Sequence, residues 1–139
     1  MKKCLIVAMV ICLAVSACIS QENGRSLIGS WKLIAYGPVD SAEPAVPDQD
    51  ALLNFNEDGS LSGDTGCNEF AGNYLVEGDQ ITFGQIVSTD ILCPDLQMAQ
   101  EQAMFQVLME MASFSMESDT LTITQNGTRL VFEALPLVA

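Results

Sequence analysis

What limits the fold of this chain most is a series of short segments in which apolar and polar residues alternate. In Gln80 to Phe83, Ile81 and Phe83 lie on one face and the polar residues on the other. Turn-forming residues separate the segments, and Asn126-Gly127 is the strongest such hairpin signal. This pattern predicts an antiparallel sheet that closes around one core. Strands are expected at Ile28 to Tyr36, Ala51 to Asn56, Ser60 to Asp64, Asn73 to Glu77, Gln80 to Phe83, Gln85 to Thr89, Ser113 to Glu117, Thr120 to Thr124 and Thr128 to Glu133.

One segment breaks the series and predicts a helix. From Asp95 to about Ala112 there is no glycine and no internal proline, and Pro94-Asp95 predicts its start, with Asp95 as N-cap. The apolar residues cover more than one stripe, so the helix is expected to cover the sheet on more than one side. The main stripe consists of Leu96, Ala99, Ala103, Val107 and Met111. The fold class expected is therefore mainly β, with one helix packed across a small antiparallel β-barrel.

The first residues have the pattern of a signal peptide, expected at residues 1–17. Lys2 and Lys3 supply the positive end, and Cys4 to Val15 supplies a mostly apolar run. That run is about 18 Å long as a helix, whereas the hydrocarbon core of a bilayer is about 30 Å thick. A membrane-spanning helix is therefore not expected here.

Val15-Ser16-Ala17-Cys18 resembles a lipobox, after which prokaryotic lipoproteins are cleaved so that the cysteine carries lipid. The same residues also fit the cleavage pattern of an ordinary secreted protein. Lipidation is favoured because an exposed thiol at the cut would otherwise be reactive. We expect an exported protein of the cell envelope, anchored through Cys18 to a membrane, with residues 18–26 as a tether. If Cys18 is not lipidated, the protein is expected to be secreted.

Two cysteines remain for the folded domain, because Cys4 and Cys12 leave with the signal and Cys18 is used by the anchor. An even pair outside the cytoplasm predicts a disulfide between Cys67 and Cys93. Two buried reduced thiols are the alternative that the sequence leaves open.

The mature chain is strongly acidic. All 18 acidic residues follow Cys18, and three basic residues remain, so its net charge is 3 − 18 = −15. Such a surface repels nucleic-acid phosphates, and no basic patch offsets it. Nucleic acid is therefore excluded as a partner.

The segment Gly66 to Tyr74, GCNEFAGNY, resembles the signature of the META domain family, which includes the heat-inducible protein HslJ. Thr89 to Cys93 resembles the family's threonine-to-cysteine segment, although Ile91-Leu92 replace its usual Met-Ala. Glu101 on the helix and the hairpin LTITQNGTRLVF follow in the family's order. The resemblance covers nearly the whole mature chain, and the domain is expected at residues 27–135.

This resemblance implies a calycin-like β-barrel with one helix across it. It also implies a role in envelope stress or antibiotic tolerance, no established catalytic activity and frequent lipidation. The residues carried over from the family motif are expected to be structural. They are Gly66, Cys67, Asn68, Gly72, Tyr74, Thr89, Cys93 and Glu101.

The motif itself allows two interpretations, a structural clasp and a ligand site, of which the clasp is favoured. Its glycines, Gly63, Gly66 and Gly72, suit a bulged or sharply turned segment with positive φ, and Asn68 suits a turn.

A catalytic cysteine needs a nearby base, usually histidine, and the chain has no histidine. No enzymatic activity, metal or cofactor is expected.

Two functions remain. The first is a lipid-anchored, non-catalytic envelope protein that binds or supports an unknown envelope protein. The alternative is a carrier of a small apolar ligand inside the barrel. The carrier hypothesis requires an open cavity between the helix and the sheet, and it fails if the interior is filled by Trp31, Phe83, Phe105 and Phe132.

Overall fold

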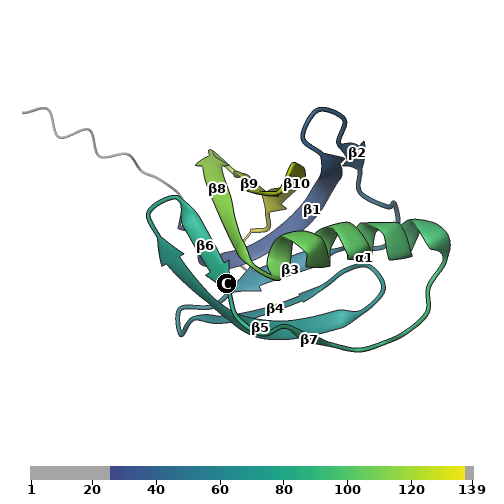
Figure 1. Cartoon of the computed structure of the whole chain (residues 1–139), viewed down its shortest axis with the longest axis horizontal. Coiled ribbons are helices and arrows are strands. Elements are labelled where there is room, and N and C mark those ends of the chain that lie inside the picture. Colours follow the sequence, from purple (N-terminus) through teal and green to yellow (C-terminus); the bar gives the residue numbers. More distant parts are fainter. Residues whose placement is uncertain (1–25, 137–139) are drawn as a thin grey trace, which may run out of the picture.

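The computed structural model describes residues 26–136, which form a closed antiparallel β-barrel with one helix (Figure 1). Eight strands follow one another around the barrel in the order β10-β9-β8-β6-β5-β4-β3-β1, and β1 pairs with β10 to close it. Two short strands are added, β2 to β1 and β7 to β5. The expected fold class is confirmed. The elements are β1 (Gly29–Pro38), β2 (Glu43–Pro44), β3 (Leu52–Phe55), β4 (Ser60–Asp64), β5 (Glu69–Glu77), β6 (Gln80–Phe83), β7 (Val87–Ser88), α1 (Asp95–Leu108), β8 (Met111–Glu117), β9 (Thr120–Gln125) and β10 (Thr128–Ala134).

The strands agree closely with the alternation in the sequence, and β4 and β6 begin and end at the predicted residues. β5 is longer than predicted because the family motif itself extends the strand, with Glu69 opposite Asp64 of β4. β7 is shorter than predicted, because only Val87 and Ser88 pair with β5.

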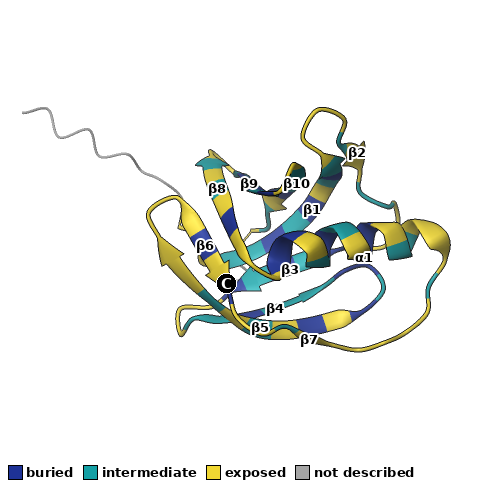
Figure 2. Ribbon diagram, viewed as in Figure 1, coloured by how far each residue is buried: buried dark blue, intermediate teal, exposed yellow. Residues whose placement is uncertain are grey.

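Large side chains fill the interior of the barrel. The buried positions are dark blue along the strands and α1 in Figure 2. Trp31, Phe83 and Phe132 lie in this core, and the Trp31 indole donates a hydrogen bond to the carbonyl of Leu27 at 2.8 Å. Small barrels are commonly filled by side chains in this way. The expected filler Phe105 is partly buried at the edge of this core, where it also lines a groove described below. The packed interior therefore does not favour a ligand at the centre of the barrel.

The helix is shorter than predicted, and the predicted N-cap is wrong. α1 ends at Leu108 because Met111 and Ala112 already belong to β8. Pro94 occupies the N-cap position, Asp95 is the first helical residue, and no side chain caps this end.

The buried face of α1 also differs from the predicted stripe. Leu96 and Ala99 are exposed, whereas the polar residues Gln100 and Glu101 are buried. The buried residues are Gln100, Glu101, Met104, Val107 and Leu108. α1 packs against β1, β8, β9 and β10. On the side of β4 and β5 its contacts are both polar, from Glu101 to Thr65 and Asn68, and apolar, from Phe105 to Phe70.

Within residues 26–136 no helix is long and apolar enough to cross a membrane. Cys18, the expected signal peptide and most of the expected tether lie outside the described residues. Their assignments stay predictions.

Candidate functional site: a groove on α1 and the clasp beneath it

Three segments that are distant in sequence meet beside α1, and together we call them the clasp: residues 65–68, residues 89–93 and Glu101. A disulfide joins Cys67 to Cys93, with an S–S distance of 2.03 Å and a Cα–Cα distance of 5.9 Å. The expected pairing is confirmed, and the alternative of two reduced thiols is not.

Asn68 lies at the centre of the clasp and is 1% exposed. Its Oδ1 accepts hydrogen bonds from the Thr89 hydroxyl at 2.8 Å and from the Ile91 amide at 2.7 Å. Its Nδ2 donates to Glu101 Oε2 at 2.9 Å and to the Ile91 carbonyl at 3.1 Å. The sequence suggested a local turn for Asn68, whereas its side chain joins all three segments of the clasp.

Thr65 is a fully buried residue of the clasp that the sequence did not single out. Its hydroxyl donates to Glu101 Oε2 at 2.6 Å. The hydroxyl oxygen of Thr65 also accepts hydrogen bonds from the backbone amides of Asn68 at 2.9 Å and of Cys67 at 3.2 Å. One hydroxyl therefore provides hydrogen bonds both to the backbone amides of the turn and to the carboxylate on the helix. Buried polar groups generally need such hydrogen-bond partners.

Gln100 was missed as well. It is fully buried, and its Nε2 donates to the Thr65 carbonyl at 2.7 Å while its Oε1 accepts from the Val46 amide at 2.8 Å. Adjacent Gln and Glu residues on a helix usually face water, so the sequence alone carried no signal for this contact.

The glycines of the motif are needed for two different reasons. Gly66 has a φ of 86°, as expected for a turn glycine. Gly72 does not have positive φ, and a Cβ there would lie 2.7 Å from Ile86 Cδ1 and 2.9 Å from the Gln85 carbonyl oxygen. Gly63 likewise leaves no room for a Cβ against the Leu52 carbonyl. The positive φ expected for Gly63 and Gly72 is therefore wrong, and close packing explains both residues.

Tyr74 belongs to the motif but lies away from the clasp. Its hydroxyl donates to the Asn56 carbonyl at 2.7 Å, and its ring meets Phe55 edge to face at 4.8 Å. Burial, and then the negative charge of Asp58, raise the pKa of Tyr74. It stabilises the β3–β4 hairpin rather than a site.

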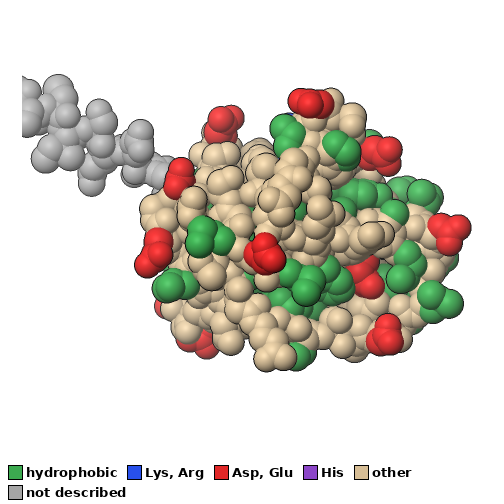
Figure 3. All heavy atoms as spheres, viewed as in Figure 1, with side chains coloured by type: hydrophobic (Ala, Val, Ile, Leu, Met, Phe, Trp, Pro, Cys, Tyr) green, Lys and Arg blue, Asp and Glu red, His purple; other side chains and the backbone are tan. Residues whose placement is uncertain are grey.

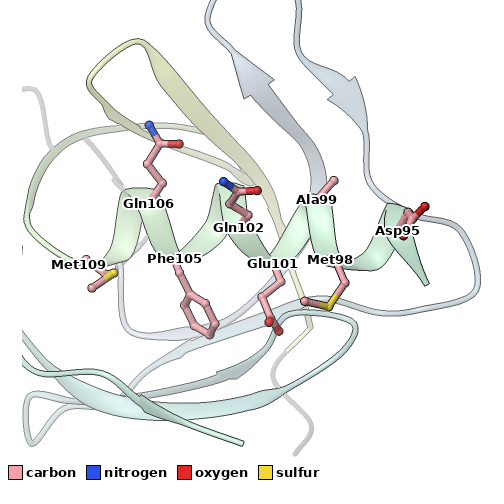
Figure 4. Close-up of a pocket in the computed structure, with 8 residues that line it drawn as sticks. All are labelled: Asp95, Met98, Ala99, Glu101, Gln102, Phe105, Gln106 and Met109. Carbon is pink, nitrogen blue, oxygen red and sulfur yellow. The ribbon is translucent and has the colours of Figure 1, made fainter. Parts of the chain in front are cut away.

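A groove of about 760 Å³ lies along α1 beside the clasp (Figure 4). Met98, Glu101 and Phe105 point from α1 toward the strands below it, as Figure 4 shows. Phe105 meets Phe70 of β5 edge to face at 5.6 Å and so marks the inner wall. We call this the α1 groove, and its lining residues are Asp95, Met98, Ala99, Glu101, Gln102, Phe105, Gln106 and Met109.

Several large apolar side chains of α1, of the segment before it and of β7 are exposed. Leu92, in the segment that leads into α1, is 88% exposed, and Leu96 in the first turn of α1 is 66% exposed. Val87, Ile91 and Met109 are also largely exposed. Apolar side chains gather over this part of the molecular face, with acidic groups scattered around them (Figure 3). The α1 groove is thus an open surface groove with a mainly apolar wall.

The Glu101 carboxylate at the base of the α1 groove is 9% exposed and is held by hydrogen-bond donors alone. No lysine or arginine of residues 26–136 forms an ion pair with it; Lys32 instead pairs with Asp50 at 2.6 Å. Its negative charge is therefore not neutralised by a basic side chain in this part of the chain.

A model of the META domain matches residues 25–136. The chain belongs to the META domain family. This META domain includes the clasp and the α1 groove, so the family motif and the disulfide lie in one structural unit.

Solved structures similar to this META domain share its fold. An NMR structure of a protein from Burkholderia xenovorans has 22% identity and a TM-score of 0.64, and the match covers 77% of this chain and 81% of that one. A lipocalin-like protein from Bacteroides uniformis has 23% identity and a TM-score of 0.51, with 78% and 98% covered. A comparison with curated proteins found no match.

Proposed function

We propose that this META domain protein is a lipid-anchored, non-catalytic envelope protein that holds a small apolar molecule in the α1 groove. The observation that carries the proposal is the groove itself, about 760 Å³ in volume, with Met98, Phe105 and Met109 in its wall. Ligand sites of this size commonly combine apolar walls with a few polar groups. This proposal keeps the carrier hypothesis but moves the ligand from the filled barrel to its outside.

The clasp supports a binding role because it makes the groove rigid. The disulfide and the bonds of Asn68 and Thr65 fix α1 against the motif segment. A site held in shape before the ligand arrives loses less entropy on binding.

A non-catalytic role is supported by the residue types available. The chain has no histidine, and the two cysteines of the described domain are joined in the disulfide. Residues 26–136 also contain no group of three or more His, Cys, Asp or Glu side chains arranged to hold a metal ion. The function proposed is therefore to bind and present a molecule at the envelope, where the family resemblance implies a role in stress or antibiotic tolerance.

The groove is tested by filling it. Ala99 is exposed and lines the groove, so Ala99→Trp should place an indole in it, whereas Gln80→Trp puts the same side chain on exposed β6. The neutral fluorescent probe N-phenylnaphthylamine should bind the wild type and Gln80→Trp equally. Its affinity for Ala99→Trp should be lower by a factor of about ten or more, and a factor of ten corresponds to about 1.4 kcal/mol. No binding by the wild type, or equal binding by Ala99→Trp, would overturn the proposal.

The anchor is tested separately with Cys18→Ala. Loss of the acyl chains should move the protein from the membrane fraction to the soluble fraction, because each buried methylene contributes about 0.8 kcal/mol. Cys18→Ala protein that stays with the membrane would contradict the lipid anchor, and it would leave the groove proposal unaffected.

A further inference from the structure

Building on the groove proposed above as a binding site, we propose that its ligand is an apolar organic cation, an amine or quaternary ammonium on an alkyl or aromatic body, with Glu101 as its counter-ion. The proposal concerns the charge of the ligand, which the apolar wall alone does not determine.

The first step is the state of Glu101. Its carboxylate is buried, and a buried charge is costly unless it is paired or fully hydrogen-bonded. Thr65 and Asn68 donate to Oε2 at 2.6 and 2.9 Å, whereas Oε1 receives one hydrogen bond, from Asn68 at 3.1 Å. A carboxylate has about four acceptor positions, so Oε1 keeps capacity for a further donor.

The second step is the place of Glu101 in the groove. Glu101 is part of the lining of the α1 groove and extends from the helix on the same side as Met98 and Phe105 (Figure 4). An ammonium group in the groove would donate its N–H to Oε1 and supply the positive charge that the described basic residues do not.

The third step is the rest of the lining. Phe105 offers an aromatic ring beside Glu101, and aromatic faces attract organic cations. The sulfur atoms of Met98 and Met109 are polarisable and adapt to different apolar bodies. Asp95 is a second acidic residue of the lining, and no lysine or arginine belongs to it. The groove is therefore complementary to a molecule that is both apolar and positive.

The charge of the whole chain acts in the same direction. Its formal net charge is −13 before any signal peptide is removed. A field of this sign raises the local concentration of cations and repels anionic amphiphiles such as fatty acids. Of the apolar molecules that fit the groove, the cationic ones are favoured both at a distance and in contact.

The test compares three probes that share one alkyl body: octylammonium, octanol and octanoate. Binding is measured by chemical-shift changes of the isotope-labelled intact chain carrying Cys18→Ser, which removes the lipid-bearing residue. Octylammonium should bind about ten- to a hundredfold more tightly than octanol, since hydrogen bonds to charged groups contribute on this scale. The shifts should lie on α1 and at residues 87–93.

Two variants assign the preference to the groove. Glu101→Gln removes the charge with little change of shape, and it should lose most of the preference for octylammonium over octanol. Gln102 is an exposed lining residue, so Gln102→Lys leaves the buried hydrogen bonds of Glu101 intact. This variant should bind octylammonium more weakly and octanoate more tightly than the wild type. Gln80→Lys makes the same substitution at an exposed position of β6, and it should keep the wild-type order of affinities for the three probes.

The outcomes separate this inference from the function on which it rests. If octanol binds in the groove as tightly as octylammonium, or if Gln102→Lys keeps the preference, the cation inference is overturned and the groove remains a site for apolar ligands. If neither probe binds the wild type, both proposals fail. Glu101→Gln protein that unfolds leaves the decision to Gln102→Lys.

Discussion

At the scale of single residues, three buried polar side chains connect the family motif to the helix. Thr65, Asn68 and Glu101 form hydrogen bonds with one another, so each one satisfies groups that the others would leave unpaired. An unpaired polar group in a buried position is more costly than the net gain of one hydrogen bond. The clasp is therefore sensitive to the loss of a single oxygen atom.

Thr65→Val tests this sensitivity with almost no change of shape. The valine removes the donor to Glu101 Oε2 and the acceptor for two backbone amides, so the free energy of unfolding should fall by about 2 to 4 kcal/mol. Thr82→Val on exposed β6 is the control and should change it by less than about 0.5 kcal/mol. The measurement is urea denaturation, and equal midpoints for the two variants would contradict the assigned role of Thr65.

Both tyrosines should titrate at higher pH in the folded protein than in the unfolded chain. Burial and then a nearby carboxylate, Glu43 for Tyr36 and Asp58 for Tyr74, raise both pKa values above the usual value of about 10. As the pH rises above about 10, the unfolded chain loses these protons first, so the folded state loses stability.

Alkaline ultraviolet titration of native and urea-unfolded protein measures this difference, because the chain has only these 2 tyrosines. The single variants Tyr36→Phe and Tyr74→Phe leave one tyrosine each and assign the two titrations. Coincident native and unfolded curves would show that neither hydroxyl is affected by the fold.

At the scale of elements, the strands were predictable and the packing of the helix was not. Alternation is a local property, and Gln80–Phe83 of β6 has its two apolar residues on the buried face as expected. The buried face of α1 depends on Gln100 and Glu101, whose partners Thr65 and Asn68 lie more than thirty positions away. Apolar periodicity contains no information about such partners, which is why exposed Leu96 was predicted to be buried.

The family resemblance supplied part of what periodicity could not. It identified Asn68, Thr89 and Glu101 as motif residues, and all three meet in the clasp. It did not identify Thr65 or Gln100, and it did not reveal that the exposed face of α1 forms a groove.

The disulfide between Cys67 and Cys93 should stabilise the folded domain against unfolding. It joins residues 26 positions apart, so its loss should lower the free energy of unfolding by roughly 3 to 4 kcal/mol in the chain-entropy model. Urea denaturation with and without reductant measures the effect on the wild type. The double variant Cys67→Ser with Cys93→Ser should have a free energy of unfolding as low as that of the reduced wild type, and reductant should not change it. An unchanged wild-type midpoint after complete reduction would contradict this prediction.

At the scale of the whole molecule, closure depends on the last strand. β10 pairs with both β9 and β1, and it contributes the fully buried Leu130 and Phe132 to the core. Without it the barrel is open, and β9 and β1 each lose one partner strand. Local changes elsewhere weaken one part of the sheet, whereas this loss affects the entire ring.

A chain ending at Gly127 lacks β10 and should not unfold cooperatively in urea, whereas a chain ending at Leu135 should unfold like the full protein. The shorter chain loses the hydrogen bonds of two strand pairs together with the apolar area of the core residues of β10. Cooperative unfolding of the chain ending at Gly127 would show that the barrel does not require closure.

The contact between β1 and β10 has a practical consequence for how the domain can be rearranged. The Leu135 amide donates to the Ser30 carbonyl at 2.8 Å, so β1 begins at the corner where β10 ends. A short peptide can bridge that corner, and new termini placed at the exposed turn of Gly78-Asp79 would cut no strand. Such a circular permutant would move any fused reporter from this corner to the turn between β5 and β6.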